Sequence, residues 1–445
     1  MGRNGRILRI SVIGTGYLGL THAVCMADLG HQVLAIDVDA EKIAKAARGE
    51  TPFFEPGLEP LLRKNLDAGR LRFTSSFAEV GEFADVHFVC VGTPQAKDGS
   101  GGADLSYVFS AADALAPHLN RPTLIVGKST VPVGTARQFT ARVRAAAPAG
   151  DGVEFAFNPE FLREGYAVQD SLTPDRIVFG VTSPAAEELL REVYAVPLAS
   201  GIPGLSMDLE TAELVKVAAN SFLATKISFI NVMAEMCEAS GADVIKLADA
   251  IGIDERIGRK FLSPGLGFGG GCLPKDIRAF RATAADRGVE SLVNLLATVD
   301  TINLGRRERV ITLARAALGD LAGKRIAVLG AAFKPNSDDI RDSPSLAISA
   351  RLADEGAAVT VHDPVAMPNA ARVRPDLTYA DSVHQAAERA DLVLHLTEWA
   401  DYRAIDPAAL RTIVASPVLI DGRCTLDAAA WRAAGWTVHV PGRPS

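Results

Sequence analysis

The chain has 445 residues, 48% of them apolar and 22% charged, so its length fits two or three globular domains and its composition excludes an intrinsically disordered protein. Acidic residues outnumber Lys and Arg by 53 to 46, and this net charge of −7 disfavours nucleic acid as the main partner. No apolar run reaches the ~18 residues of a membrane span, and the five Cys are scattered without a CxxC pair. We therefore expect no membrane partner, no signal peptide, no disulfide framework, no metal site and a cytoplasmic location.

A strand–turn–helix–strand pattern opens the chain. Residues 7–13 predict a buried strand, residues 17–29 an apolar helix, and residues 31–36 a second strand. Further apolar runs predict strands at 86–91, 124–127 and 154–157, with helical segments between them. This alternation is typical of a doubly wound parallel sheet, which we place in a first domain of residues 1–205.

The first turn carries a dinucleotide-binding pattern. Gly14, Gly16 and Gly19 give GTGYLG, and Asp37 follows Gly19 by 18 residues, at the end of the second strand. Such glycines let the backbone approach a pyrophosphate at a helix N-terminus, while the acid accepts hydrogen bonds from ribose hydroxyls and repels a 2′-phosphate. The pattern predicts NAD rather than NADP as cofactor, against the alternative of a tight turn with a solvated Asp. Lys42 either contacts the same ribose or is solvated.

The pattern changes near residue 205. Ser206 is the expected helix cap, and no Gly or Pro interrupts the chain until Gly241. A helix of this length would span roughly 52 Å, which suggests a spine between two domains or a surface that packs against a second subunit. Helical periodicity continues to about residue 318, apart from a glycine-rich segment at 263–271, so we expect a central helical domain at 206–318.

A second strand–helix alternation follows. Its predicted strands are residues 325–330, 358–363, 391–396 and 417–421. This part, residues 319–445, is expected to be another nucleotide-fold domain, but it lacks GxGxxG, so the two α/β domains are expected to bind different ligands.

One cysteine lies in an unusual segment. Cys272 lies in SPGLGFGGGCLPKD. A cysteine is usually buried in the core as a small apolar side chain, but this glycine run instead favours a loop whose backbone presses against a ligand and presents the thiol to it. Lys275 and Asp276 could shift the thiol's pKa or position water, so Cys272 is our candidate nucleophile. Cys25, Cys90 and Cys237 are expected in the core, and Cys424 stays unassigned.

Further candidates follow strands or share a helix face. Lys216 and Asn220 are four residues apart on the long helix, where they could stabilise an oxyanion or simply be solvated. Glu160 and Glu164 in NPEFLREG are candidates for a base or for water positioning, with capping and ion pairing as the alternatives. Thr93 and Thr130 also follow strands. Lys334 and Arg341 could bind phosphates or form surface ion pairs.

Taken together, these segments resemble the nucleotide-sugar dehydrogenase family. The matching motifs, in family order, are GTGYLG, CVGTP, STVPVGT, NPEFLREG, KVAAN, FGGGCLPKD and LGAAFKPNSDDIRDSP, and TEWADYRAID and LIDGR extend the match. The resemblance implies oxidation of a sugar C6 alcohol to a carboxylate with reduction of two NAD, through a cysteine thiohemiacetal and thioester. It also implies at least a homodimer built on the long helix.

The resemblance also assigns residue roles. Cys272 matches the nucleophile, Lys216 and Asn220 match groups that steady oxygen charge, Glu160 and Asp276 match residues of proton transfer and water placement, and Thr130 lies beside that water. The residues matched to the cofactor site are Gly14, Gly16, Gly19, Asp37, Lys42, Thr93, Thr130, Glu164, Lys275 and Arg341. Those matched to the substrate site are Glu160, Phe161, Leu162, Arg163, Lys216, Asn220, Arg256, Phe261, Leu262, Ser263, Pro264, Gly265, Gly269 and Lys334, of which Arg256 reaches a neighbouring subunit's site.

The family members differ in the sugar nucleotide that they oxidise. FKPNSDD is similar to the branch acting on UDP-glucose, which yields UDP-glucuronate; relatives acting on GDP-mannose share the cysteine motif. Relatives acting on N-acetylmannosamine nucleotides carry histidine before the cysteine, where this chain has Gly271, and many others carry serine there. Cys424 stands where asparagine is frequent. A catalytically silent NAD-binding regulator is the alternative of another class.

Overall fold

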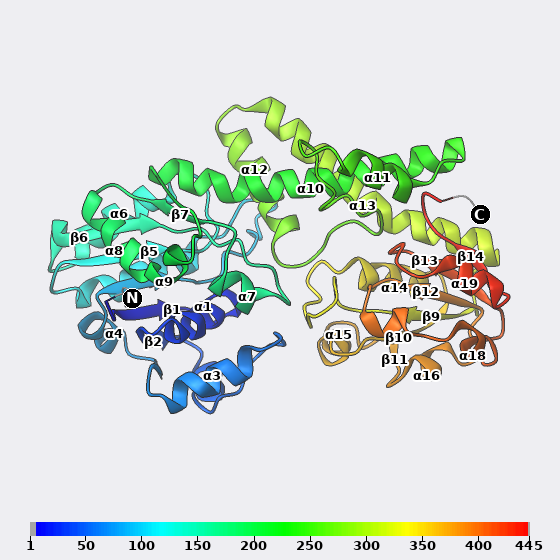
Figure 1. Ribbon diagram of the computed structural model, residues 1–445, viewed down its shortest axis with the longest axis horizontal. Coiled ribbons are helices and arrows are strands. Elements are labelled where there is room, and N and C mark those ends of the chain that lie inside the picture. Colours follow the sequence, from blue (N-terminus) through cyan, green and yellow to red (C-terminus); the bar gives the residue numbers. More distant parts are fainter. Residues whose placement is uncertain (1–5, 444–445) are drawn as a thin grey trace. The chain divides into compact units, whose positions relative to one another are not determined.

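Two separate sheets organise the chain in the computed structural model, which describes residues 6–443 (Figure 1). One unit comprises the chain up to Ala219 together with Ala282–Arg287, and the other comprises Asn220–Arg281 and the chain from Gly288 onward. Two of the three boundaries fall inside helices, and the division into domains at 1–205, 206–318 and 319–445 stays a prediction.

The first unit contains an eight-stranded sheet. Its strands are β1 (Arg9–Ile13), β2 (Gln32–Ile36), β3 (Leu71–Thr74), β4 (Val86–Val89), β5 (Thr123–Gly127), β6 (Val153–Phe157), β7 (Ile177–Gly180) and β8 (Gly204–Met207). They lie in the order β3-β2-β1-β4-β5-β6-β7-β8, and the pairing of β6 with β7 is antiparallel while the others are parallel. The helices are α1 (Tyr17–Asp28), α2 (Ala40–Ala47), α3 (Leu58–Asp67), α4 (Phe77–Phe83), α5 (Ser106–Leu115), α6 (Thr135–Ala146), α7 (Ala167–Leu172), α8 (Pro184–Val193) and α9 (Ala195–Ala199).

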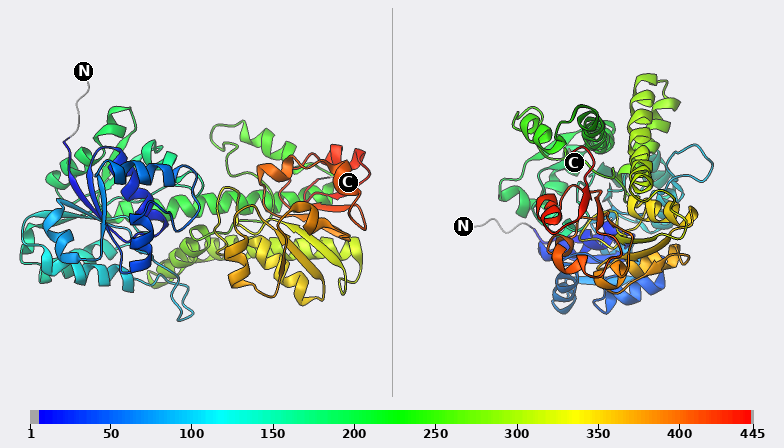
Figure 2. Two further views of the ribbon diagram at one scale, coloured as in Figure 1. Left: turned by 90° about the horizontal axis from the view of Figure 1, so that it is seen from below. Right: turned by 90° about the vertical axis from the view of Figure 1, so that its right-hand side faces the viewer.

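Helices cover both faces of this sheet (Figure 2). Leu20 and Met26 of α1 belong to the apolar cluster on one face, and Leu115 of α5 and Phe139 of α6 belong to the cluster on the other. The predicted doubly wound α/β architecture is therefore confirmed, with one antiparallel pairing that the sequence did not indicate. Because β1, β4, β5 and β6 are parallel, their carboxyl ends share one sheet edge, where ligands bind in such folds.

The helix cap assigned to Ser206 is wrong. Ser206 lies in β8, and Asp208 caps the long helix α10 (Leu209–Ser240) by accepting a hydrogen bond from the N–H of Thr211 at 2.8 Å. Strand β8 has the sequence GLSM and is largely exposed, so it lacks the apolar alternation by which a strand is predicted.

The second unit combines long helices with a six-stranded sheet. After α10 come α11 (Val244–Gly252), α12 (Leu273–Asp286) and α13 (Glu290–Leu318). The sheet has the order β11-β10-β9-β12-β13-β14, all parallel, with the strands β9 (Arg325–Leu329), β10 (Ala358–His362), β11 (Thr378–Tyr379), β12 (Leu392–His395), β13 (Val418–Asp421) and β14 (Thr437–His439). Its helices are α14 (Pro344–Asp354), α15 (Met367–Val373), α16 (Val383–Ala387), α17 (Ala400–Arg403), α18 (Pro407–Arg411) and α19 (Ala428–Ala433).

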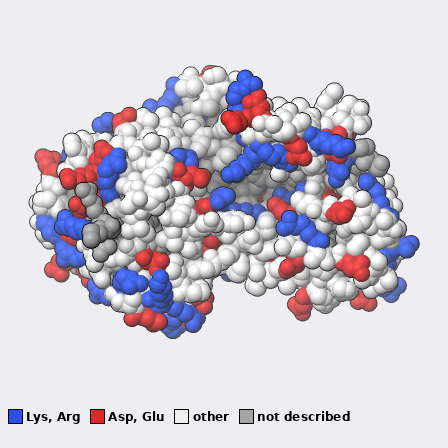
Figure 3. All heavy atoms as spheres, in the orientation of Figure 1, with Lys and Arg blue, Asp and Glu red and all other residues white. Residues whose placement is uncertain are grey.

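Helix α10 has the length predicted for the spine, with 32 residues. Within the described part of the chain it is the one helix that is long and apolar enough to cross a membrane, judged by length and composition alone, and an 18-residue stretch of it has a mean hydropathy of 1.3. However, 44% of that stretch is buried inside the protein, and the core helices of globular proteins can be equally long and apolar. On the face drawn in Figure 3, acidic and basic side chains are both widely distributed.

A strained residue in the second unit offers a test of the backbone. Arg389 is exposed and has φ of 54°. We expect Arg389→Gly to raise the free energy of unfolding by about 0.5–1 kcal/mol, because relief of the left-handed conformation (about 1–2 kcal/mol) exceeds the entropic cost of glycine (about 0.5–1 kcal/mol). The control is Glu388→Gly, where φ is −57° and stability should fall. Urea titration measures both; equal losses would contradict the backbone assignment.

Candidate active site

The glycine turn of the first unit has the shape that a pyrophosphate requires. Gly14 has φ of 94°, and a Cβ at Gly19 would lie 1.8 Å from the carbonyl oxygen of Gly14, so both positions require glycine. A Cβ at Gly16 would meet no atom within 4 Å, so the turn has open space there. Gly16 is also the N-cap of α1 and provides no side-chain cap. The first N–H groups of α1 are therefore left for an anion, which fits the pyrophosphate of NAD.

Asp37 lies beside this turn. Its Oδ2 accepts hydrogen bonds from the N–H of Thr15 at 2.7 Å and from the Thr15 hydroxyl at 3.0 Å. The Lys42 side chain is 45% exposed, and its Nζ lies 3.6 Å from Oδ2 of Asp39 rather than at Asp37. The carboxylate of Asp37 is thus held where a ribose could reach it, and the position of Lys42 fits the solvated alternative better.

The loops after β4 and β5 meet at the sheet edge. Thr93 is buried and follows β4, whereas Thr130 is half-buried and follows β5. The hydroxyl of Ser129, next to Thr130, donates to the carbonyl oxygen of Val91 at 2.6 Å, so the two loops are joined by a hydrogen bond.

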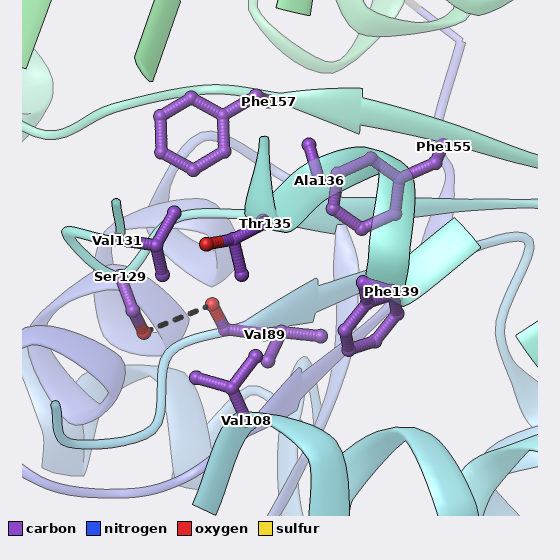
Figure 4. Close-up of a pocket in the computed structure, with 10 residues that line it drawn as sticks. Val89, Val108, Ser129, Val131, Thr135, Ala136, Phe139, Phe155 and Phe157 are labelled. Carbon is purple, nitrogen blue, oxygen red and sulfur yellow. Dashed lines mark hydrogen bonds between the residues drawn. The ribbon is translucent and has the colours of Figure 1, made fainter. Parts of the chain in front are cut away.

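A small cavity lies beneath this edge (Figure 4). Its volume is about 20 Å³, and the aromatic rings of Phe139, Phe155 and Phe157 point toward it. A space of this size holds at most a water molecule, and an apolar lining offers that water no partners. The cavity is therefore not a ligand site.

The loop after β6 carries a buried ion pair. Nζ of Lys216, on α10, donates to Oε1 of Glu160 at 3.0 Å, and the two side chains are 5% and 10% exposed. Oε2 of Glu160 also accepts from the N–H of Leu162 at 2.8 Å. Nζ of Lys216 lies 5.6 Å from the ring centroid of Phe161. The ammonium group and the carboxylate are thus positioned for proton transfer or for stabilising charge on an oxygen atom.

Sequence reasoning missed a second buried lysine here. Nζ of Lys128 donates to Oδ1 of Asn158 at 2.9 Å, and Oδ1 of Asn158 also accepts from the Tyr194 hydroxyl at 2.6 Å. Burial lowers the pKa of Lys128 to about 8. Its position directly after a buried strand, next to Ser129, was the available signal.

The second unit brings the predicted groups around Cys272 together. Asn220 donates to Oδ2 of Asp276 at 2.7 Å, and Nζ of Lys275 donates to Oδ1 at 2.6 Å, while Asp276 itself is 2% exposed. Cys272 is exposed and immediately precedes α12, and its carbonyl oxygen accepts from the N–H of Asp276 at 2.9 Å. No group of three metal-ligating side chains occurs among the residues described.

The glycines before Cys272 pack against the chain itself. A Cβ at Gly270 would lie 2.6 Å from the ring of Phe333, one at Gly269 would lie 2.5 Å from the carbonyl oxygen of Asp342, and one at Gly271 would overlap the guanidinium of Arg341. We expected this run to press against a ligand. For Gly269 and Gly270 the structure gives a packing reason, because a Cβ there would meet the segment 333–342, so contact of this run with a ligand stays a prediction.

The segment 261–268 is held by side chains of the long helices. Asn231 accepts from the N–H of Gly265 at 2.9 Å, and Asn303 accepts from the N–H of Phe268 at 2.7 Å. Arg306 donates to the carbonyl oxygen of Gly265 at 3.2 Å. These three residues were not found from the sequence, since a polar residue inside a helix pattern gives no signal of what it holds. Within the predicted substrate segment, Leu262, Pro264, Gly265 and Gly269 are buried, while Phe261 and Ser263 are exposed.

The cations predicted for the ligand sites each contact a neighbour in their own unit. Three are partly or largely exposed and paired with acids: Arg163 with Asp170 at 2.7 Å, Arg256 with Asp254 at 2.5 Å, and Arg341 with Asp339 at 2.6 Å. Nζ of Lys334 lies 5.3 Å from the ring centroid of Phe333. Arg423, which the sequence reading missed, donates to the carbonyl oxygen of Phe333 at 2.9 Å and adds a further cation to this segment. Glu164, predicted for the cofactor site, is buried.

The remaining cysteines are unsuited to nucleophilic chemistry. Cys25, Cys90 and Cys237 are buried as expected, and burial raises the pKa of both Cys25 and Cys90 to about 12. Burial likewise raises the pKa of Cys424, and its φ of 56° lies in the left-handed region, which asparagine adopts more readily than cysteine.

Comparisons with known proteins identify the family of the chain. Three family models match successive parts of the chain: the NAD binding domain of the UDP-glucose/GDP-mannose dehydrogenase family over residues 8–197, its central domain over 210–304, and its UDP binding domain over 327–428. A UDP-glucose 6-dehydrogenase of Rhizobium meliloti is 44% identical over 94% of this chain and 95% of its own length. One of Pseudomonas aeruginosa is 42% identical over 98% of both chains.

Solved structures show the same architecture. A UDP-glucose dehydrogenase from Pyrobaculum islandicum matches with a TM-score of 0.90 and 37% identity, covering 98% of this chain and 100% of that one. A GDP-mannose dehydrogenase from Pseudomonas aeruginosa matches with a TM-score of 0.54 and 26% identity, covering 98% of each chain. The chain belongs to the UDP-glucose/GDP-mannose dehydrogenase family, as an NAD-binding nucleotide-sugar dehydrogenase with a UDP-binding domain.

Proposed function

We propose that this chain oxidises C6 of UDP-glucose to the carboxylate of UDP-glucuronate, in two steps that together reduce two NAD. Cys272 carries this proposal, because it is exposed at the start of α12 whereas the other thiols are buried or half-buried. The comparisons support UDP-glucose over GDP-mannose, since the relatives of 44% and 42% identity are named for UDP-glucose and the GDP-mannose structure is 26% identical.

The chemistry needs a nucleophile between the two oxidations. NAD, when bound, accepts one hydride in each step. The C6 alcohol loses a hydride and a proton to become an aldehyde, and the Cys272 sulfur then bonds to C6 to give a thiohemiacetal. Loss of a second hydride and proton gives a thioester, which water cleaves to the carboxylate while the sulfur regains a proton.

The two polar clusters supply the remaining roles. In the first unit, Lys216 stabilises negative charge on the C6 oxygen, and its partner Glu160 takes part in proton transfer, with Thr130 next to the hydrolytic water. In the second, Asn220 stabilises charge on an oxygen atom, and Asp276, which accepts from Asn220 and Lys275, places water. Burial of Glu160 and Asp276 strengthens these interactions, because water screens them less.

The same reasoning assigns the binding residues. The cofactor is held by Gly14, Gly16, Gly19, Asp37, Thr93, Thr130, Glu164, Lys275 and Arg341. The nucleotide sugar is held by Phe161, Leu162, Arg163, Arg256, Lys334, Gly269 and residues 261–265. Phe261 has φ of 65°, a strained conformation that supports a functional role for this segment. A reducing compartment, the cytoplasm, suits an enzyme that depends on a free thiol.

We further propose a homodimer or higher homo-oligomer built on α10. Phe222, Phe229 and Met236 are 66%, 48% and 61% exposed and lie seven residues apart, so they form one apolar stripe on the helix. A stripe with this spacing is suited to packing against a second helix of the same kind.

The NADH stoichiometry of the reaction tests the four-electron scheme. Complete conversion of limiting UDP-glucose should yield two NADH per sugar, measured by nicotinamide absorbance, because the thiohemiacetal permits a second hydride transfer. Cys272→Ser should keep nucleotide binding but lose formation of the acid by at least about 10³-fold, since a hydroxyl is a much weaker nucleophile at neutral pH.

Two outcomes would contradict this prediction. One NADH per sugar with release of free aldehyde would exclude the four-electron reaction, and full activity of Cys272→Ser would mean that another residue is the nucleophile. Faster turnover with GDP-mannose than with UDP-glucose would favour the alternative substrate. NAD binding without turnover of any nucleotide sugar would favour the silent regulator. Cys237→Ser, in the core, is the matched control.

The choice of NAD over NADP depends on the charge of Asp37. Asp37→Asn keeps an acceptor for Thr15 but removes the charge, so it should lower the preference for NAD by about tenfold or more. Ratios of kcat/KM for the two cofactors measure this. Lys42→Ala is the companion variant: an unchanged KM for NAD agrees with a solvated lysine. An unaltered cofactor preference in Asp37→Asn would contradict the assignment of Asp37.

The role of the apolar stripe in assembly can be tested by a single substitution. Phe229→Lys should convert the oligomer into smaller species, because a lysine in the apolar stripe would be buried without a partner. Light scattering after size exclusion gives the mass. Val373→Lys changes an exposed apolar residue of α15 and should leave the mass unchanged. Retention of the full mass by Phe229→Lys would place the interface elsewhere.

A further inference from the structure

A buried carboxylate of the first unit has no role in the chemistry above. Glu55 lies in the loop before α3 and is 6% exposed. Its Oε2 accepts from the N–H of Gly165 at 2.6 Å, and its Oε1 accepts from the N–H of Ala167 at 2.7 Å. The hydroxyl of Tyr17 also donates to Oε2.

These donors are all uncharged. An ionised carboxylate taken out of water costs several kcal/mol of free energy unless hydrogen bonds replace its hydration. The hydroxyl of Tyr17 remains a donor, because burial and the hydrogen bond to Glu55 raise its pKa. Together with the two N–H groups it satisfies both oxygens of Glu55, so each partner depends on the others.

The three partners connect segments that are far apart in sequence. Tyr17 is the first residue of α1 and lies between Gly16 and Gly19 of the phosphate turn. Gly165 follows Glu164, which is buried and belongs to the proposed cofactor site. The ring of Phe53, two residues before Glu55, packs against Tyr17 with centroids 4.7 Å apart. Glu55 therefore fixes the distance between the phosphate turn and the segment that carries Glu164.

We propose that Glu55 is a positioning residue for the dinucleotide, which holds the Glu164 segment against the N-terminus of α1 through Gly165, Ala167 and Tyr17. The inference rests on the cofactor site of the proposed function, but it concerns NAD binding and not the sugar. Glu55 does not touch the cofactor in this scheme; it acts through the residues that do.

The test measures NAD binding by calorimetry on the full chain without sugar nucleotide, together with the KM of each substrate. Glu55→Gln keeps the size of the side chain, but its amide NH₂ group replaces one of the two oxygens. The main-chain N–H of Gly165 or of Ala167 then faces a donor instead of an acceptor. We expect the Kd and the KM for NAD to rise about tenfold, while the KM for UDP-glucose changes less than twofold. Tyr17→Phe should give a smaller rise, and the double variant should show less than the product of the two effects, because both act in one network.

Glu59→Gln is the matched control, since Glu59 lies four residues further along and forms an exposed pair with Arg63 at 2.7 Å. It should leave both KM values unchanged. If Glu55→Gln melts at a lower temperature but binds NAD as the unaltered chain does, Glu55 is merely structural and the proposal is overturned. If Glu55→Gln does not fold, Tyr17→Phe decides: an unchanged Kd for NAD overturns the proposal. If the unaltered chain binds NAD but does not oxidise UDP-glucose, only the proposed function is refuted.

Discussion

Carboxylates that accept hydrogen bonds from main-chain N–H groups hold the loops at the strand ends of both sheets. Glu55 holds Gly165 and Ala167, and Asp37 holds Thr15. Glu213 of α10, which is 1% exposed, accepts from the N–H groups of Gly134 at 2.7 Å and Ala136 at 2.8 Å, at the start of α6. Because each carboxylate comes from a distant part of the chain, the loops keep their positions only while the whole unit is folded.

The turns after the first strand of each sheet begin alike but continue differently. Gly14 after β1 and Gly330 after β9 both have positive φ, and both donate to the last residue of the neighbouring strand, at 2.8 Å and 2.7 Å. In the first unit a helix begins three residues after the glycine, whereas in the second, α14 begins only at Pro344. The second turn therefore lacks a helix N-terminus for a pyrophosphate.

The acids after the second strands differ in the same way. Asp363 accepts from the N–H groups of Ala331 at 2.7 Å and Ala332 at 3.0 Å and from Nε1 of Trp399 at 3.2 Å, and it is fully buried. Asp37 lacks such an indole donor among the described residues and remains half-buried. The first acid therefore keeps surface that a ribose could reach, while the second is enclosed and serves only to hold neighbouring loops. This difference agrees with the NAD-binding and UDP-binding family models that match the two parts.

The sequence by itself determined the two strand–helix alternations, the long helix and the turn with Gly14, Gly16 and Gly19. These follow from local periodicity and from glycines whose backbone needs are local. The motifs also identified Cys272 as the distinctive thiol. Only the tertiary structure decided that Lys216 pairs with Glu160, that Asn303 and Arg306 hold the segment 261–268, and that Gly269–Gly271 pack on residues 333–342. The partners of these groups lie tens of residues away in the sequence, and a buried polar contact depends on where the folded backbone brings them, which no local pattern records.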